Sequence, residues 1–227
     1  MSKKHTFNIF TDGSSLIDGS FYEASSAVCV YYEGDVVFEV GKYHRGGTNS
    51  LGEVFAVQMA LDNITEFLDY NKLELKNVHI NIFSDSDYVV RSLTEYVNSW
   101  KRVGRESKWI SSQGTPVAHQ EIIKHIYYEY LTNNKYDIDI FHMRGHVGEK
   151  ITIPLAYAKF CKKNKVKISI DDFKKLVKCN HQVDKFAEYM RVNKAGIVKR
   201  SGTSKWLIWF ATLEKENGLI RIRKRIR

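Results

Sequence analysis

Phe7-Asn8-Ile9-Phe10-Thr11-Asp12-Gly13-Ser14-Ser15 is the stretch of this chain that decides the fold. An alternating apolar run ends at an aspartate, followed by a glycine and two serines, which predicts a β-strand that stops in a tight turn. A carboxylate at such a strand end is a suitable first ligand for a hard divalent cation. Asp-Gly is also a common turn pair, so Asp12 taken alone could be a plain turn residue.

The composition indicates a folded protein with an acidic partner. The 227 residues carry a formal net charge of +9, with 43% hydrophobic and 13% aromatic residues, which excludes a wholly disordered chain. The positive charge favours a polyanion, with nucleic acid ahead of an anionic membrane surface. No apolar run is long enough to span a bilayer, and the first residues show no signal peptide. Three scattered cysteines without zinc-type spacing predict a reduced, cytoplasmic protein.

Strand-like and helix-like segments alternate through the first part of the chain. The first three strands are expected to be antiparallel, because Glu33-Gly34-Asp35 indicates a hairpin between the second and the third. The later strands alternate with helices, and the fourth again ends in an aspartate, Asp85. We expect strands at residues 7–12, 26–32, 36–40, 78–84 and 137–143, and helices from about residue 51, from residue 88, at 117–131, after Ser169 and after Asn180.

Two segments extend this pattern. Residues 149–178 are rich in lysine and are interpreted as an insertion, with Ser169 as a helix cap before Phe173. Near the end, Glu216-Asn217-Gly218 lies between residues 206–211 and 219–227, which predicts a β-hairpin whose last strand alternates isoleucine with arginine. The expected organisation is therefore one domain over residues 1–196 and a basic extension over 197–227.

Acidic residues recur where predicted elements begin or end. Two of them terminate strands and two open helices: Asp12, Asp85, Glu53 and Asp184. Taken singly, each could be a turn residue or a carboxylate that compensates a helix dipole. Together they would repel one another strongly unless cations neutralise them. Two Mg²⁺ ions roughly 3.5–4 Å apart, as in sites of phosphodiester cleavage, would resolve this repulsion.

Five short motifs occur in order along the chain. They are Thr11-Asp12-Gly13-Ser14, Thr48-Asn49-Ser50-Leu51-Gly52-Glu53, Ser84-Asp85-Ser86-Asp87-Tyr88-Val89, Arg144-Gly145-His146-Val147-Gly148 and residues 180–187. Together they resemble the motifs of the type 1 ribonuclease H family of bacteria and eukaryotes. The similarity covers roughly residues 5 to 194, and Asp87 stands where the family usually has glutamine. The resemblance implies an α/β ribonuclease H-like fold with a mixed five-stranded sheet, three antiparallel strands and then two parallel ones, flanked by helices.

The resemblance also implies roles for particular residues. Asp12, Glu53, Asp85 and Asp184 would hold two Mg²⁺ ions, with Mn²⁺ as a substitute, and His146 would assist proton transfer or product release. Gly13, Ser14, Asn49 and Ser50 would lie along the RNA strand, whose 2′-hydroxyls distinguish it from DNA. A basic handle would grip the DNA strand, and it consists of Trp100, Lys101, Arg102 and Arg105.

Plainer interpretations stay open for several of these residues. His146 could be a loop histidine without a catalytic role, and the handle could be a solvated face with one anchoring tryptophan. Five positive charges in residues 221–227 favour a nucleic-acid contact through Arg221, Arg223 and Arg225. The alternative for this strand is an edge that carries charge only to prevent aggregation.

The sequence therefore predicts a monomeric endonuclease that hydrolyses the RNA strand of RNA–DNA hybrids and leaves 5′-phosphate and 3′-hydroxyl ends. Removal of replication primers or R-loops would be its natural use. One alternative is a nuclease of the same fold that acts on DNA, such as a resolvase, an integrase or an exonuclease. Another is a module that binds nucleic acid without cleaving it.

Overall fold

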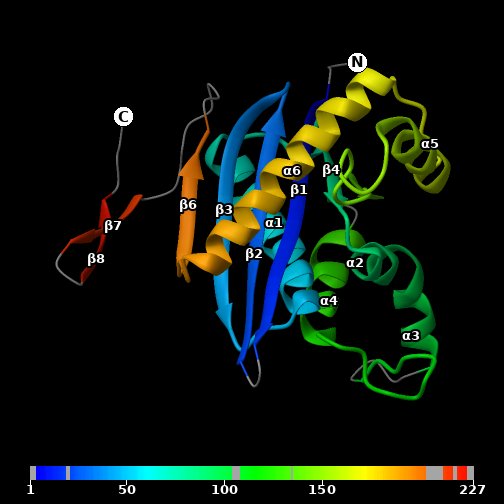
Figure 1. The fold of residues 1–227 in the computed structure, drawn as a ribbon, viewed down its shortest axis with the longest axis horizontal. Helices are drawn as coiled ribbons and strands as arrows, with labels where there is room; N and C mark the ends of the chain where they lie inside the picture. The colour runs from blue at the N-terminus through cyan, green and yellow to red at the C-terminus, as the bar shows by residue number, and fades with distance from the viewer. Residues whose placement is uncertain are drawn as a thin grey trace.

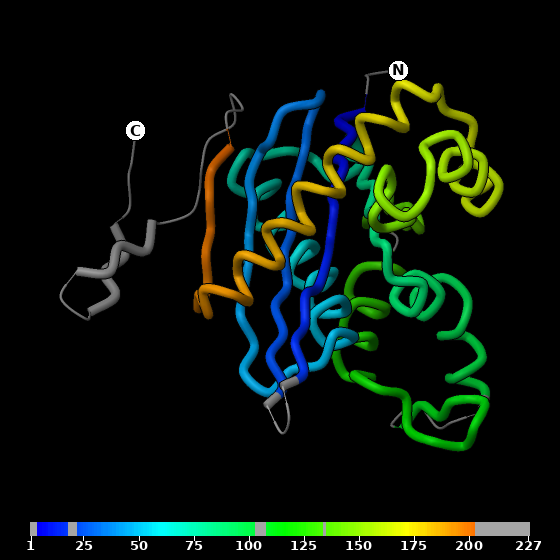
Figure 2. The backbone as a smooth tube through the Cα atoms, in the orientation of Figure 1, coloured from blue at the N-terminus to red at the C-terminus, as the bar shows by residue number. Residues whose placement is uncertain are grey.

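The computed structural model shows one mixed sheet with helices on both of its faces (Figure 1). It describes residues 4–18, 21–103, 108–133 and 135–202, and the backbone of residues 212–216 and 219–223. The long helix near the end of the chain crosses one face of the sheet diagonally, and the first helix lies against the other face (Figure 2).

The sheet has six strands rather than the predicted five, in the order β5-β4-β1-β2-β3-β6. The predicted arrangement is otherwise confirmed, since β1, β2 and β3 are antiparallel and β4 and β5 run parallel to β1. The additional strand β6 pairs antiparallel with β3 at the edge. The strands are β1 His5–Asp18, β2 Phe21–Tyr32, β3 Asp35–Arg45, β4 Val78–Ser84, β5 Ile138–His142 and β6 Ile197–Ser201.

Most helices follow the predicted segments. Pro154 lies in the first turn of α5, where its missing N–H costs no hydrogen bond. The α-helices are α1 Asn49–Tyr70, α2 Asp87–Arg91, α3 Val97–Val103, α4 Gln120–Ile126, α5 Ile153–Asn164 and α6 Ile170–Val192. The described residues also include a 3-10 turn at Leu75–Asn77 and two π-helical turns at Ser92–Tyr96 and Tyr127–Leu131.

Alternation along β1 divides the interior into two apolar cores. Phe7 and Ile9 are buried on the face covered by α1, whereas Phe10 is buried on the face covered by α6, where it stacks on Phe83. Side chains of a strand point alternately to the two faces, so this parity also applies to the residues that follow. Asp12 therefore shares the face of Phe10, beneath α6.

The prediction that β1 stops at Asp12 is wrong. Pairing with β2 continues from Asp12 opposite Ala27 to the end of the strand at Asp18. What ends here is the parallel ladder with β4, whose last pair is Thr11 with Ser84. Small residues after Asp12 are compatible with a long antiparallel strand as well as with a turn, and local sequence does not distinguish the two.

The last helix differs from the prediction in a second respect. α6 is a single helix that begins after the Ser169 cap, whose hydroxyl accepts a hydrogen bond from the Asp172 N–H at 3.0 Å. Asn180 was expected to cap a separate helix, but it lies buried within α6. Residues 170–178 of the predicted insertion are thus the first turns of the helix that carries Asp184, because no residue between them breaks the helix.

The predicted terminal hairpin is present in the described backbone. β7 Thr212–Glu216 pairs antiparallel with β8 Leu219–Arg223. The first strand was expected at residues 206–211, which lie outside the described residues, as do residues 224–227. The asparagine–glycine pair therefore predicts the hairpin, of which β7 is the first described strand.

Two features bear on the expected environment of the protein. None of the described helices is long and apolar enough to cross a membrane. All three cysteines are free thiols: Cys29 is buried, and Cys161 and Cys179 are half-buried.

His44 is expected to make the fold sensitive to acid. Burial, and next the charge of Lys42, lower its pKa to about 4 from 6.5, and Nε2 bonds to the Ser26 hydroxyl at 2.8 Å. A depressed histidine pKa removes stability as pH falls from 6.5 through 4. The full shift corresponds to about 3.4 kcal/mol, and solvent screening reduces this to about 1–2 kcal/mol.

The measurement is urea unfolding of the wild type and of His44→Gln at pH 7 and pH 4. The variant should lose about 1–2 kcal/mol less than the wild type between the two pH values. Equal losses in the two proteins would contradict a buried neutral His44.

Candidate active site

Asp12 and Asp85 occupy equivalent positions on neighbouring strands. Each follows the last residue of the parallel ladder, Thr11 on β1 and Ser84 on β4. Adjacent strands lie about 4.8 Å apart, and residues in register point to the same face. The two carboxyls are therefore neighbours, and the Asp12 carboxyl hydrogen-bonds that of Asp85.

Asp184 reaches the same place from α6. Val183 and Ala187 on either side of it are buried against the sheet, and the Ser25 hydroxyl of β2 donates to the Ala187 carbonyl at 2.6 Å. This bond fixes α6 about one turn beyond Asp184. The helix thereby presents a third carboxylate from above the face to which Asp12 and Asp85 belong.

Glu53 comes from α1, on the opposite face. Asn49 Nδ2 donates to its Oε1 at 2.6 Å, and the Ser86 hydroxyl donates a short hydrogen bond to its Oε2. Glu53 was expected in the first turn of the helix, but the first turn of α1 holds no acidic residue. The carboxylate is thus held by side chains and not by the helix terminus.

Two glycines allow α1 to approach the sheet at this point. A Cβ on Gly52 would lie 2.4 Å from the Ser25 carbonyl oxygen, and one on Gly13 would lie 2.5 Å from the Glu53 nitrogen. Contacts this short are not tolerated between backbones. Gly13 was expected to leave room for an RNA backbone, but the space beside it is filled by α1.

Gly52→Ala is accordingly expected to displace Glu53. The methyl group must push α1 from β2, which destabilises by about 1–3 kcal/mol and moves the carboxylate away from its neighbours. Thermal unfolding and nuclease assays would measure both effects. Gly196→Ala is the matched control, because a Cβ there meets nothing within 4 Å. Equal stability and activity of the two variants would contradict this packing role.

The electrostatics of the cluster are those of crowded carboxylates. Burial raises the pKa of Asp12 well above its usual value, and the charges of Asp85 and Asp184 raise it further, followed by Glu53. Burial, then Asp184, raises the pKa of Asp85. Burial also raises the pKa of Glu53, while the bond from Ser86 opposes that change. Such sites favour either a proton or a cation.

Asp12 fits a hard cation best. Asp12 is only 8% exposed, its Oδ1 accepts a hydrogen bond from the Gly13 N–H at 2.8 Å, and it forms no ion pair among the described residues. Carboxylate oxygens are the ligands that Mg²⁺ prefers. In the conformation observed, however, no three His, Cys, Asp or Glu side chains of the described residues are grouped closely enough to hold one ion. Glu53, directed toward Asn49 and Ser86, would have to turn.

The loop after β5 borders the cluster. Gly145 lies so close to Asp85 that a Cβ would meet Oδ2 at 2.4 Å. The next residue, His146, is exposed, and its Nδ1 lies 3.4 Å from Glu149 Oε2. Its charge lowers the pKa of Asp85, and both residues line one cleft of about 360 Å³. The structure therefore brings His146 to the edge of the carboxylate cluster.

Comparison with known proteins identifies the family of this chain. The sequence model of the RNase H family matches residues 4–190, most of the chain. The chain belongs to the ribonuclease H family. It is an enzyme of that family, and the five-motif resemblance is confirmed.

The relatives are distant in sequence. Ribonuclease H of Thermosynechococcus vestitus is 28% identical over 145 residues, covering 64% of this chain and 80% of the relative. Ribonuclease H of Tropheryma whipplei strain Twist is 36% identical over 97 residues, covering 41% of this chain and 56% of the relative.

Solved structures share the fold. LC9-RNase H1, a type 1 enzyme with the type 2 active-site motif, matches with a TM-score of 0.55 and 16% identity, covering 86% of this chain and 77% of that one. LC11-RNase H1, isolated from compost, matches with a TM-score of 0.51 and 17% identity, covering 84% and 98%. The fold is therefore that of type 1 ribonucleases H.

The polar residues expected along the RNA strand flank the cluster. Ser14 Oγ accepts from Arg191 Nε at 2.9 Å, and Ser50 Oγ lies 3.2 Å from His119 Nε2. The Asn49 side-chain amide is already hydrogen-bonded to Glu53. Ser50 is thus near a histidine that sequence reasoning left unassigned.

The basic handle is only partly as expected. Trp100 is 8% exposed and packs against Trp109 and Tyr96, so it anchors the segment and presents no indole to a ligand. Lys101 lies over the Tyr127 ring at 5.0 Å, and Arg102 is exposed. A mixture of aromatic and basic residues does not reveal which aromatic ring faces the core.

Four of the predicted contacts rest on residues of which less is described. Arg105 and Arg225 lie outside the described residues. Arg221 and Arg223 lie in β8, of which the backbone alone is described.

Ser86 and Arg144 were missed. Ser86 caps α2 by accepting from the Val89 N–H at 3.3 Å while its hydroxyl binds Glu53. Its place between two aspartates was a usable signal for a cap. Arg144, in the cleft with Asp85, carries no such signal, because any loop can contain an exposed arginine.

Proposed function

We propose that this chain hydrolyses the RNA strand of RNA–DNA hybrids with two Mg²⁺ ions, leaving 5′-phosphate and 3′-hydroxyl ends. The observation that carries the proposal is that Asp12, Asp85 and Asp184, which come from three elements on one face, influence one another electrostatically, with Glu53 beside them. Removal of primers or R-loops would use this activity, in the cytoplasm and as a monomer.

In this proposal the carboxylates hold the metal ions and His146 transfers a proton. Asp12 and Asp85, already adjacent, would hold metal together with Asp184 and Glu53. Bound Mg²⁺, or Mn²⁺ in its place, would supply a nucleophilic water and stabilise the leaving oxygen. His146, solvent-exposed at the edge of the cluster, would take up or deliver a proton, a role that imidazole side chains commonly have in catalysis.

Substrate contacts would surround this centre. Asn49 and Ser50, beside Glu53 at the start of α1, would face the RNA strand and its 2′-hydroxyls. Ser14 would lie with them, and Gly13 would keep α1 close. Lys101, Arg102 and Arg105 would bind phosphates of the DNA strand, and Arg221, Arg223 and Arg225 would add positive charge from the terminal hairpin.

The test is a hybrid with a labelled RNA strand, incubated with the protein and Mg²⁺. Cleavage within the RNA, with end analysis showing 5′-phosphate products, is the expected result. Duplex DNA and branched DNA of the same sequence serve as the comparison. Cleavage of DNA with the hybrid left intact would favour a DNA nuclease, and binding without turnover in Mg²⁺ or Mn²⁺ would favour a binding module. Either outcome would overturn the proposal.

A further inference from the structure

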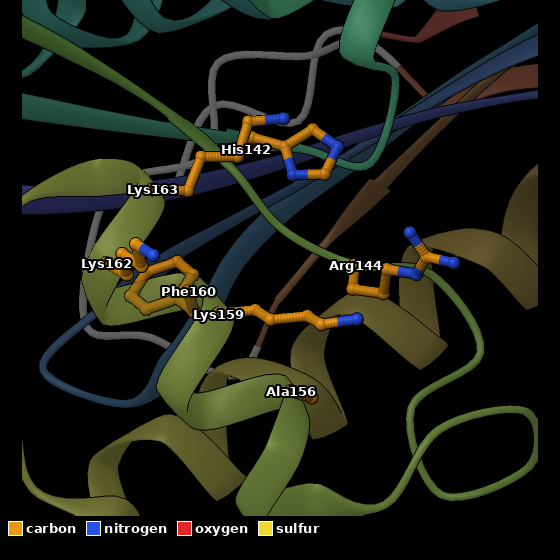
Figure 3. Close-up of a pocket in the computed structure, with 7 residues that line it drawn as sticks. All are labelled: His142, Arg144, Ala156, Lys159, Phe160, Lys162 and Lys163. Carbon is orange, nitrogen blue, oxygen red and sulfur yellow. The ribbon is translucent and has the colours of Figure 1, made fainter.

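A second pocket lies next to the catalytic cleft and belongs mainly to α5 (Figure 3). Its volume is about 430 Å³. Ala156 and Phe160 form its apolar floor, and nitrogen-bearing side chains surround it. In Figure 3, Lys159 extends from α5 toward the side where Arg144 lies, and Lys163 lies beside the His142 ring. The lining is His142, Arg144, Ala156, Lys159, Phe160, Lys162 and Lys163.

The pocket carries an excess of positive charge. Among the described residues that line it, none is acidic. Lys163 is paired with Asp87, but Arg144, Lys159 and Lys162 form no ion pair in the part of the chain that the structure describes. Three cations without counter-ions around one hollow repel one another, so an anion placed there is stabilised by all of them.

The pocket is held firmly against the sheet. Asn164, the last residue of α5, accepts from the His142 N–H and donates to the His142 carbonyl, both at 2.9 Å. Phe160 packs on Phe173 of α6, with ring centroids 5.3 Å apart, and near Phe83 of β4. α5 is therefore attached at the end of β5 and cannot shift without breaking buried contacts.

The pocket continues into the catalytic cleft. His142 and Arg144 line both, and the cleft also contains Asp85, His146 and Lys150. A polyanionic strand whose scissile bond lies at the carboxylates would thus pass beside Arg144. An acidic cluster repels such a strand, so cations next to it offset that repulsion.

We propose that Arg144, Lys159 and Lys162 form a subsite for a backbone phosphate of the nucleic acid that lies in the catalytic cleft. This inference rests on the proposed function, and it gives the lysine-rich segment of α5 a role in holding the substrate. A protein partner is less suited to the site, because Arg144 lines both this pocket and the catalytic cleft in which the nucleic acid would lie.

The test compares Lys159→Gln/Lys162→Gln with Lys72→Gln/Lys76→Gln, which removes equal charge from exposed positions before the start of β4, at the end of the strand opposite Asp85. Binding of a fluorescent RNA–DNA hybrid is measured by anisotropy in EDTA over a range of salt concentrations. The α5 variant should bind about tenfold more weakly at 0.1 M salt, with a salt slope smaller by about two, and the control should match the wild type.

Uncharged backbone linkages show whether the RNA strand or the DNA strand places its phosphate in the subsite. Methylphosphonates placed one at a time in the RNA or DNA strand should weaken wild-type binding at one position, and should have no further effect there in the α5 variant. Equal binding by the α5 variant and the control would overturn the subsite. If the wild type itself does not cleave the hybrid, the proposed function is overturned instead, so the two failures are distinguishable. Circular dichroism melts verify that both variants fold.

Discussion

Asp85→Asn is expected to reduce cleavage of an RNA–DNA hybrid by about a thousandfold or more. The substitution keeps the size of the side chain but removes the charge that lies at the centre of the cluster. Asp184, His146 and Asp12 act on the Asp85 carboxyl, which in turn raises the pKa of Asp12 and of Glu53. Loss of several kcal/mol of metal-dependent stabilisation corresponds to this factor, at 1.36 kcal/mol for each tenfold.

Asp87→Asn is the matched control, since it makes the same chemical change two residues away. Asp87 is exposed and paired with Lys163, and exposed ion pairs contribute about 0–1 kcal/mol. Its activity should stay within about threefold of the wild type. Initial rates at saturating Mg²⁺ measure both. Comparable activity of Asp85→Asn and the wild type would remove Asp85 from the catalytic centre.

Asp12→Asn is expected to change protein stability in opposite directions with and without Mg²⁺. In EDTA the variant should be more stable than the wild type by about 1 kcal/mol or more, which is about 2–4 °C in Tm. The reason is that Asp12 is buried among like charges that the neutral amide does not feel. With Mg²⁺ at about 100 times its Kd, the wild type should gain about 2.7 kcal/mol, and the variant much less.

Differential scanning fluorimetry with EDTA and with increasing Mg²⁺ measures this inversion. Asp35→Asn is the control, because Asp35 is exposed at the start of β3. The stability of this variant should respond to Mg²⁺ as that of the wild type does. Parallel Mg²⁺ responses of wild type and Asp12→Asn would show that Asp12 does not hold the ion.

Much of the fold follows from local patterns. Alternation at residues 7–10 predicts the two-faced strand β1, and the asparagine–glycine pair at residues 217 and 218 predicts the hairpin. β6 was missed because residues 197–201 acquire strand structure from pairing with β3, which is a tertiary contact. The length of α6 was missed for the opposite reason: Asn180 is a good cap residue, but packing overrode that preference.

The sequence predicted the carboxylates of the candidate site but not the residues that hold them in position. Asp12 and Asp85 could be inferred to meet, because each follows a strand of a mixed sheet. The bonds from Asn49 and Ser86 to Glu53, and the close approach at Gly52, depend on how α1 docks and leave no trace in local sequence. The same holds for the burial of Trp100, which only packing could reveal.

The uninterrupted α6 has a consequence for how this chain tolerates changes in length. Each residue of an α-helix turns the following ones by about 100°. Adding or deleting one residue between Ser169 and Asp184 would swing the carboxylate away from the sheet, or drag Val183 and Ala187 out of the core. The short connection between the end of α5 at Asn164 and the Ser169 cap is free of this restriction. Variation in length among related chains should therefore concentrate in this connection, and the 15 residues from Ser169 to Asp184 should keep a constant length.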